Sequence, residues 1–306
     1  MKHFINFNDI TPDELDDLLT LADDLKKQTK ANIPQTVLSG KTLGMIFSKS
    51  STRTRVSFEA GMYQLGGHAL FLSSQDIQLG RGESVEDTAK VLSRYLDGIM
   101  IRTFDHQDVL DLARFGTIPI INGLTDLMHP CQALADLMTI KEYKGTLNGL
   151  KLAYVGDGNN VANSLLHASA KAGMHIAVAS PQGYLCDQQC ISDAKEEAKK
   201  TGGSVIMTND PYEAVKNADA VYTDTWVSMG QEAEKAKRIP VFMPYQVDSS
   251  LMKAASPEAI FLHCLPAYRG YEVSPEVIDG PSSVVFDEAE NRLHAQKAIL
   301  VRLLGT

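Results

Sequence analysis

The sequence lacks the features that mark several large classes of protein. No apolar run approaches the roughly 18–20 residues that a membrane-spanning helix needs, and the N-terminus, MKHFINFNDI, has no basic-then-apolar signal-peptide pattern. Basic residues are not in excess: 29 lysines and arginines stand against 38 aspartates and glutamates, a net charge of −9. We therefore expect a cytoplasmic protein that binds neither nucleic acid nor a membrane.

Cysteine is also scarce, with four residues in the chain. Cys186 and Cys190 form a C-x3-C pair, but no second pair accompanies them, and the spacing does not match a zinc site. The sequence therefore predicts no metal site, and cytoplasmic thiols are expected to stay reduced.

What the chain does contain is a regular alternation of short apolar runs with helical patterns. A first series of predicted strands covers residues 42–47, 68–73, 98–102 and 118–123, and a second covers 151–157, 175–180, 204–208, 220–226, 260–266 and 283–286. Such alternation is typical of right-handed βαβ units around a parallel sheet.

The length of 306 residues favours two domains, at roughly 100–200 residues each. We predict an α/β protein with two doubly wound parallel-sheet domains linked by long interdomain helices. The first domain comprises residues 1–135 and is completed by the C-terminal helix, 288–304, and the second comprises residues 150–285. Ligands of such folds bind at the carboxyl ends of the strands.

The segment SKSSTRTR follows the first predicted strand and opens a helix. A helix N-terminus presents unpaired backbone N–H groups and binds anions. Ser51, Thr52 and Thr54 add hydroxyl donors, and Arg53 and Arg55 add guanidinium groups that suit phosphate. The segment predicts a phosphate site, although a well-capped helix with solvated arginines would use the same residue types. It is not a P-loop, because the G-x-x-x-x-G-K-[ST] pattern is missing.

Here the sequence resembles a known family. STRTR followed by SFE resembles the carbamoyl-phosphate signature of the aspartate/ornithine carbamoyltransferase family, and HPCQ (129–132), DTWVSMG (224–230) and HCLP (263–266) match further motifs in order. The resemblance extends from about residue 3 to residue 304 and is closest to the ornithine branch. It implies an enzyme that transfers the carbamoyl group of carbamoyl phosphate to the δ-amine of L-ornithine. The products would be L-citrulline and phosphate, in arginine biosynthesis or degradation.

The resemblance also implies roles for individual residues. Those expected to bind carbamoyl phosphate are Ser51, Thr52, Arg53, Thr54, Gln78, Arg102, His129, Gln132, Cys264, Leu265 and Arg292. Those expected to bind ornithine are Asn160, Asp224, Ser228 and Met229. Arg102, His129, Asp224 and Cys264 are expected to take part in catalysis by direct transfer, without a covalent cysteine intermediate.

In this family the loop that contains Gln78 reaches a neighbouring subunit's site. The resemblance thus implies a homotrimer, or a multiple of trimers, with shared active sites. Arg81, in the same segment DIQLGRGE, is given no definite role.

Other functions are compatible with parts of the sequence. GDGNN (156–160) resembles a dinucleotide turn, but Val161 stands where the third glycine belongs, and HIAVASPQG lacks the acidic residue; we expect no cofactor. A non-catalytic phosphate-binding regulator on the same fold remains an alternative. Aspartate, putrescine and N-acetylornithine are alternative acceptors, of which aspartate would require basic groups and H-P-L-P in place of HCLP.

Overall fold

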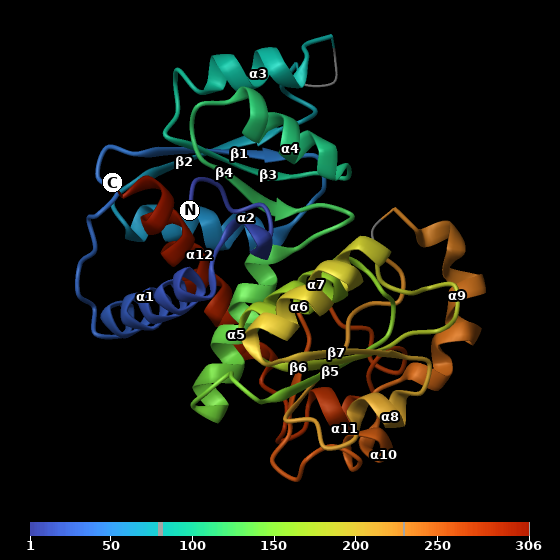
Figure 1. Ribbon diagram of the computed structural model, residues 1–306. Coiled ribbons are helices and arrows are strands. Elements are labelled where there is room, and N and C mark those ends of the chain that lie inside the picture. Colours follow the sequence, from blue (N-terminus) through green and yellow to red (C-terminus); the bar gives the residue numbers. More distant parts are fainter. Residues whose placement is uncertain (79–81, 229, 306) are drawn as a thin grey trace. The chain divides into compact units, whose positions relative to one another are not determined.

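The computed structural model describes residues 1–78, 82–228 and 230–305 (Figure 1). The chain forms two compact units. Unit 1 comprises Met1–Met138 and Glu290–Thr306, and unit 2 comprises Thr139–Ala289. Two helices, α5 (Pro130–Lys144) and α12 (Val285–Leu304), begin in one unit and end in the other. The α/β fold with two parallel sheets, predicted from the sequence, is confirmed.

Unit 1 is built on a parallel sheet of four strands. Its order is β2-β1-β3-β4, with β1 Thr42–Phe47, β2 His68–Ser73, β3 Gly98–Arg102 and β4 Ile120–Leu124. The helices are α1 Pro12–Lys30, α2 Thr52–Gln64, α3 Val85–Leu92 and α4 His106–Phe115, with a short 3-10 helix η1 at Phe7–Asp9. In Figure 1, α3 and α4 cover one face of this sheet, and α1, α2 and α12 lie on the other.

Unit 2 is built on a parallel sheet of five strands in the order β7-β6-β5-β8-β9. The strands are β5 Lys151–Val155, β6 His175–Ala179, β7 Ser204–Thr208, β8 Ala220–Tyr222 and β9 Ile260–Leu262. The helices are α6 Asn160–Lys171, α7 Gln188–Thr201, α8 Pro211–Val215, α9 Lys235–Phe242, α10 Ser249–Met252 and α11 Pro275–Ile278, with 3-10 helices η2 Glu232–Glu234 and η3 Met243–Tyr245.

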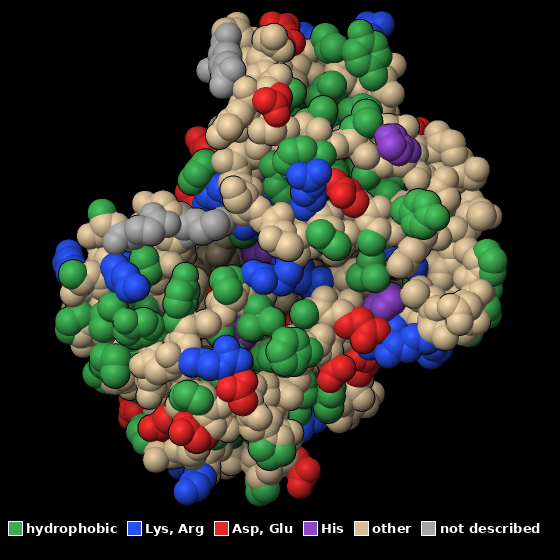
Figure 2. All heavy atoms as spheres, turned by 180° about the vertical axis from the view of Figure 1, so that it is seen from behind, with side chains coloured by type: hydrophobic (Ala, Val, Ile, Leu, Met, Phe, Trp, Pro, Cys, Tyr) green, Lys and Arg blue, Asp and Glu red, His purple; other side chains and the backbone are tan. Residues whose placement is uncertain are grey.

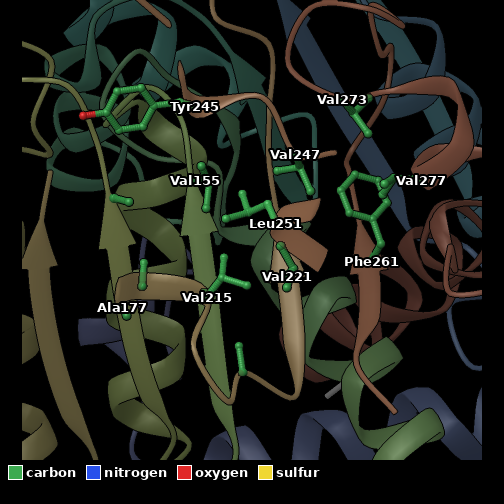
Figure 3. Close-up of a cluster of buried hydrophobic side chains, with 14 of the residues drawn as sticks. Val155, Ala177, Val215, Val221, Tyr245, Val247, Leu251, Phe261, Val273 and Val277 are labelled. Atoms are coloured by element: carbon green, nitrogen blue, oxygen red, sulfur yellow. The ribbon is translucent and has the colours of Figure 1, made fainter. Parts of the chain in front are cut away.

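The core of unit 2 explains why its strands are nearly all apolar. Val155, Val221 and Phe261, from neighbouring strands, pack against Leu251 of α10 and Val277 of α11 (Figure 3). On the other face, α6 and α7 cover the sheet (Figure 1). Because both faces of the sheet are covered, its strands have no solvent-facing side that would impose an apolar–polar alternation.

One predicted strand is wrong. Residues 283–286 form only a single bridge, between Ser283 and Phe261, and α12 begins at Val285. Val284 and Val285 are buried, but Phe286 is 73% exposed. The acidic residues Asp287 and Glu288 lie in the first turn, where they favour a helix N-terminus. The apolar run is therefore a helix start.

Two further differences concern strand limits and exposure. The predicted strands 151–157, 220–226 and 260–266 end at Val155, Tyr222 and Leu262, so their polar ends are loops. Strand β2, although apolar in sequence, is partly exposed because it lies at the sheet edge.

No helix within the described ranges is both long and apolar enough to span a membrane. On the face shown in Figure 2, acidic and basic side chains are interspersed among exposed apolar ones.

In both sheets the strand order reverses at an internal point. The reversal lies between β1 and β3 in unit 1, and between β5 and β8 in unit 2. The loops that leave neighbouring strands at such a point turn to opposite faces, and ligands bind between them. The loops after β1, β5 and β8 contain Ser51, Asn159 and Asp224, and Arg102 is the last residue of β3.

Candidate functional site

The turn between β1 and α2 forms the first part of the site in unit 1. Ser51 is the N-cap of α2, and its hydroxyl accepts a hydrogen bond from the backbone N–H of Thr54 at 3.1 Å. Ser51 therefore acts as the cap that the sequence allowed. Thr52 and Arg53 form the first turn of the helix, where backbone N–H groups have no intrahelical acceptor. A helix start of this kind can bind an anion.

Two buried guanidinium groups meet at Thr54. Its hydroxyl accepts from Arg292 Nη2 at 2.9 Å and lies 3.4 Å from Arg102 Nη1. Arg102 is the last residue of β3, and its carbonyl accepts from the N–H of Ser48 at 2.8 Å, which ties the two loops together. Arg292 comes from α12 and lies 238 residues after Thr54 in the chain. The structure thus brings three predicted residues to one point.

His129 precedes α5 and lies buried in the same electropositive region. Its pKa is held well below 6.5 by burial and then by the charges of Arg292, Arg102 and Arg53. The imidazole is therefore neutral at pH 7 and keeps one N–H donor. A neutral donor among three guanidinium groups can polarise a carbonyl oxygen without giving up a proton.

Gln132 and Cys131 of the HPCQ motif have different surroundings. Gln132 is buried on α5, and its amide nitrogen donates to Asp136 at 2.7 Å. This hydrogen bond fixes the orientation of the amide and so the position of its carbonyl oxygen, which is an acceptor. Cys131 is buried and contacts the carbonyl of Asn122 at 3.3 Å, and burial raises its pKa to about 12. Cys131 is therefore an inert packing residue.

Not every basic or polar residue that the sequence singled out joins this group. Arg55 turns away, donating to Glu59 at 2.9 Å and lying 3.7 Å from the Phe71 ring centroid. Gln78 is exposed on the segment after β2. Arg81 and Met229 lie outside the described residues.

In unit 2, a chain of hydrogen bonds links the loops after β5, β8 and β9. Asn159 caps α6, its oxygen accepting from the N–H groups of Val161 and Ala162. Its Nδ2 donates to Asp224 Oδ2 at 2.7 Å, and Asp224 Oδ1 accepts from the thiol of Cys264 at 3.2 Å. Two predicted residues, Asp224 and Cys264, are thus in direct contact.

Sequence reasoning chose Asn160 from the GDGNN turn and missed its neighbour. Asn160 is the first residue of α6 and is half-buried, whereas Asn159 makes the contact to Asp224. Asparagine directly before a helix is a strong N-cap signal, which could have distinguished the two. Ser228 is also half-buried, with its backbone N–H near Gln231 Oε1 at 3.3 Å.

The segment after β9 has a constrained backbone. Leu265 has φ +56°, a left-handed conformation that costs a leucine energy. Its N–H donates to His263 Nδ1 at 2.9 Å, and His263 Nε2 lies 3.3 Å from Glu272 Oε1. The buried pair of His263 and Glu272 therefore holds the main chain beside Cys264. Neither residue was assigned this task from the sequence.

Asp224, His263 and Cys264 offer ligand atoms within 4.8 Å of one another, close enough to consider a metal ion. Both ring nitrogens of His263 already face hydrogen-bond partners, and the thiol donates to Asp224. The three groups are arranged for hydrogen bonding to each other and to the main chain.

Arg238, on α9, braces the loop that follows Asp224. Its Nη1 donates to Asp157 at 2.8 Å and to the carbonyl of Trp226 at 3.0 Å, and its Nε donates to Glu234 at 2.8 Å. Burial raises the pKa of Asp157 to about 6, although Arg238 opposes that shift. This buried pair was also missed, because its partners lie 81 residues apart.

Comparison with known proteins identifies two matching family models. Residues 2–142 match the carbamoyl-P binding domain of aspartate/ornithine carbamoyltransferase, and residues 148–303 match the Asp/Orn binding domain. The second match includes most of α12, whose C-terminal part packs in unit 1.

Similar proteins share both sequence and fold. Ornithine carbamoyltransferase of Anoxybacillus flavithermus is 59% identical over 99% of this chain and 96% of that protein. That of Thermococcus kodakarensis is 57% identical over 97% and 94%. The solved ornithine carbamoyltransferase of Pyrococcus furiosus superposes with a TM-score of 0.97 at 55% identity, covering 99% and 97% of the two chains. The anabolic enzyme of Campylobacter jejuni gives 0.93 at 45%, covering 99% of each chain.

Proposed function

This chain belongs to the aspartate/ornithine carbamoyltransferase family, and from that premise we propose how its residues carry out the reaction. The chain is an enzyme that transfers the carbamoyl group of carbamoyl phosphate to L-ornithine, which yields L-citrulline and phosphate. The reaction belongs to arginine metabolism. We propose that unit 1 binds carbamoyl phosphate and that unit 2 binds ornithine.

The phosphate group is assigned to the start of α2. Ser51, Thr52, Arg53 and Thr54 supply backbone N–H groups, hydroxyls and one guanidinium at a helix N-terminus, where an anion is stabilised by the helix dipole. Arg102 adds a second guanidinium from β3. Support comes from the pKa of His129, which is lowered first by burial and then by the charges of Arg292, Arg102 and Arg53, so three guanidinium groups act on this region. The same charges attract a dianion.

The carbamoyl carbonyl is assigned to Arg102, His129 and Arg292. Negative charge grows on this oxygen as the amine attacks, and donors fixed in advance stabilise that charge without reorganising. The oxygen of Gln132 is assigned to the carbamoyl NH2, because its amide nitrogen is already bonded to Asp136. The main-chain carbonyls of Cys264 and Leu265 are proposed as further acceptors for this NH2.

Ornithine is assigned to Asp224, Asn160, Ser228 and the main chain of Met229. The observation that carries the choice of acceptor is the contact between Asp224 and both Asn159 and Cys264. A carboxylate in the loop after β8 suits an amino group and repels a second carboxylate, which disfavours aspartate. Cys264 is assigned to the δ-amine, without a covalent intermediate.

The amine has a reference pKa of about 10.4, that of a lysine side chain, and must lose a proton before it attacks. Asp224 and the thiol of Cys264, in contact at 3.2 Å, form the polar group in unit 2 that is proposed to orient this amine. No cofactor or metal ion is required by this scheme.

We further propose a homotrimer, or a multiple of trimers, in which Gln78 acts in a neighbouring subunit's site. Exposed apolar side chains on α2 and β2 of unit 1 support a surface for another copy: Val56 is 57% exposed, Tyr63 82% and Phe71 38%. A cytoplasmic location is also proposed, which agrees with four cysteines that form no disulfide.

The decisive experiment offers the purified chain carbamoyl phosphate with one amine at a time: L-ornithine, putrescine, L-aspartate or N-acetylornithine. We expect phosphate release and citrulline formation with ornithine alone. Asp224→Asn should keep the affinity for carbamoyl phosphate and lose most activity with ornithine. Carbamoylation of another amine in preference to ornithine would refute the choice of acceptor, and phosphate binding without any transfer would favour a regulator.

A further inference from the structure

Beneath the hydrogen-bonded loops of unit 2 lies a layer of three large buried polar side chains. They are Tyr154 on β5, Tyr222 on β8 and Glu288 in the first turn of α12, and each is fully buried. None of them takes part in the scheme proposed above. Burying polar groups at this depth is costly unless their hydrogen bonds are satisfied, so their partners are informative.

Glu288 joins the ends of two neighbouring strands. Its Oε1 accepts from the Tyr222 hydroxyl at 3.2 Å, and its Oε2 accepts from the backbone N–H of His263 at 2.9 Å. Tyr222 lies two residues before Asp224, and His263 lies directly before Cys264. A single carboxylate therefore holds both segments that place Asp224 and Cys264 in contact.

Tyr154 extends this layer to the third strand end. It is paired with Tyr222 in the sheet register, and the two rings stack with centroids 5.9 Å apart and an angle of 21°. Its hydroxyl donates to the carbonyl of Asp157 at 2.9 Å and lies 3.3 Å from Asn159 Oδ1. Burial and the charge of Asp224 raise the Tyr154 pKa, so the hydroxyl remains a donor.

The contacts close into a ring. Asn159 donates to Asp224, and Asp224 accepts from Cys264, whose main chain is held through His263 by Glu288. The buried layer thus fixes the distances between the ends of β5, β8 and β9. Misplacing a reactive group by about 1 Å can lower a rate by about 10²-fold, so a layer that fixes such distances affects catalysis without touching the substrate.

We propose that Tyr222 and Glu288 are positioning residues that hold Asp224 and Cys264 together for the attack by ornithine. This inference rests on the proposed function of the same site. It assigns to the start of α12, in unit 2, a task separate from that of Arg292, which lies in unit 1.

The experiment compares Tyr222→Phe with a matched control, Tyr245→Phe. Tyr245 lies in the core of the same unit (Figure 3), and its hydroxyl donates to the carbonyl of Asn209 at 2.7 Å. Each variant removes one hydroxyl and keeps the aromatic ring. Tyr222→Phe should lose more thermal stability, because its hydroxyl donates to a buried carboxylate and that of Tyr245 to a main-chain carbonyl. We expect kcat/KM for ornithine to fall on the order of 10-fold in Tyr222→Phe only, with the affinity for carbamoyl phosphate unchanged in both.

A second readout is the alkylation rate of Cys264, the one cysteine of the four that is not buried. Loosening its contact with Asp224 removes a nearby negative charge that disfavours the thiolate, so iodoacetamide should react faster with Tyr222→Phe than with wild type or Tyr245→Phe. Glu288→Gln serves as the second variant if Tyr222→Phe does not fold, because an amide keeps the volume of the carboxylate. The same two changes are expected for it.

The outcomes separate this inference from the proposed function. Wild-type protein that makes no citrulline would refute the proposed function itself. Wild-type protein that makes citrulline, together with Tyr222→Phe and Tyr245→Phe variants that match in kcat/KM and in alkylation rate, would refute the positioning role.

Discussion

A single imidazole illustrates how position, more than residue type, decides chemistry at the residue scale. In water the imidazole of His129 would have a pKa of about 6.5 and would be half-protonated at that pH. Burial beside Arg292, Arg102 and Arg53 keeps it neutral. Its proposed task, donating to a carbonyl oxygen, needs a neutral donor whose state does not change across physiological pH.

His129→Ala should therefore lower kcat about 10²- to 10³-fold, the usual loss for one such donor. The pH profile of kcat between pH 6 and 8 should keep its shape, because no proton is gained or lost at His129 there. Steady-state citrulline assays across this range test both statements. An inflection near pH 6.5 in the wild type that disappears in the variant would contradict the neutral state.

Unlike kcat, the free energy of unfolding should depend on pH through His129. Because the folded-state pKa of His129 is lowered, the unfolded chain binds a proton near pH 6.5 and the folded chain does not. The contribution of the neutral His129 to the free energy of unfolding is fully present above pH 6.5 and falls as the pH drops below that value. His129→Ala should lose less stability than wild type between pH 7 and pH 5, as measured by urea denaturation.

Sequence reasoning identified residues whose signal is local. Ser51, Arg53 and Thr54 form one short motif, and the structure places them at one helix start. By contrast, Glu288 acts on Tyr222, 66 residues away, and Arg238 acts on Asp157, 81 residues away. Such contacts form only when the chain folds. A sequence motif, which relies on fixed spacing between nearby residues, cannot predict them.

At the scale of elements, the packing of α2 on α12 positions the proposed carbamoyl phosphate site. Gly61 of α2 faces Leu293, Lys297 and Leu300 of α12, and a Cβ there would lie 3.3 Å from Lys297 Cγ. This close approach lets Arg292, on the same helix, reach Thr54. The Lys297 ammonium donates to Thr29 and Gln64, which fastens the three helices of this face.

Gly61→Val should separate α2 from α12. We expect the free energy of unfolding to fall by about 1–3 kcal/mol, the usual cost of overpacking. The Kd for carbamoyl phosphate should rise because Arg292 moves away from Thr54. Thermal denaturation and calorimetric titration measure the two effects. Leu112→Ala, a buried change in α4 of the same unit, should lower stability and leave the Kd unaltered. Equal affinities in Gly61→Val and wild type would disprove the coupling.

Most elements were predictable because their apolar spacing is distinctive. In α1, for example, the capping box of Thr11 and Glu14, with Pro12 in the first turn, is a helix start signal that the sequence itself contains. The segment 283–286 was misread because a short apolar run looks alike in a buried strand and at a buried helix start. The length of this run does not distinguish a strand from a helix start. The acidic residues Asp287 and Glu288, which follow it in the first turn, indicate a helix.

At the scale of the whole molecule, the proposed trimer makes a prediction about shared sites. Arg53→Ala and Gln78→Ala should each be nearly inactive alone. If each site combines Arg53 of one chain with Gln78 of its neighbour, dissociating and reassociating an equal mixture should restore about one quarter of the sites, by random assortment around a closed ring. Citrulline assays after reassociation, with sedimentation to verify the trimer, measure this. Trimers that re-form without regaining activity would exclude sharing across the interface.

The interleaving of the two units in the chain has a consequence for biosynthesis. Unit 1 needs Glu290–Thr306, which follows all of unit 2 in the chain and is therefore made after it. Domains generally fold as they emerge during translation. Unit 1 therefore cannot complete its fold until Glu290–Thr306 has been made, and one apolar face of its sheet stays open to chaperones while unit 2 folds.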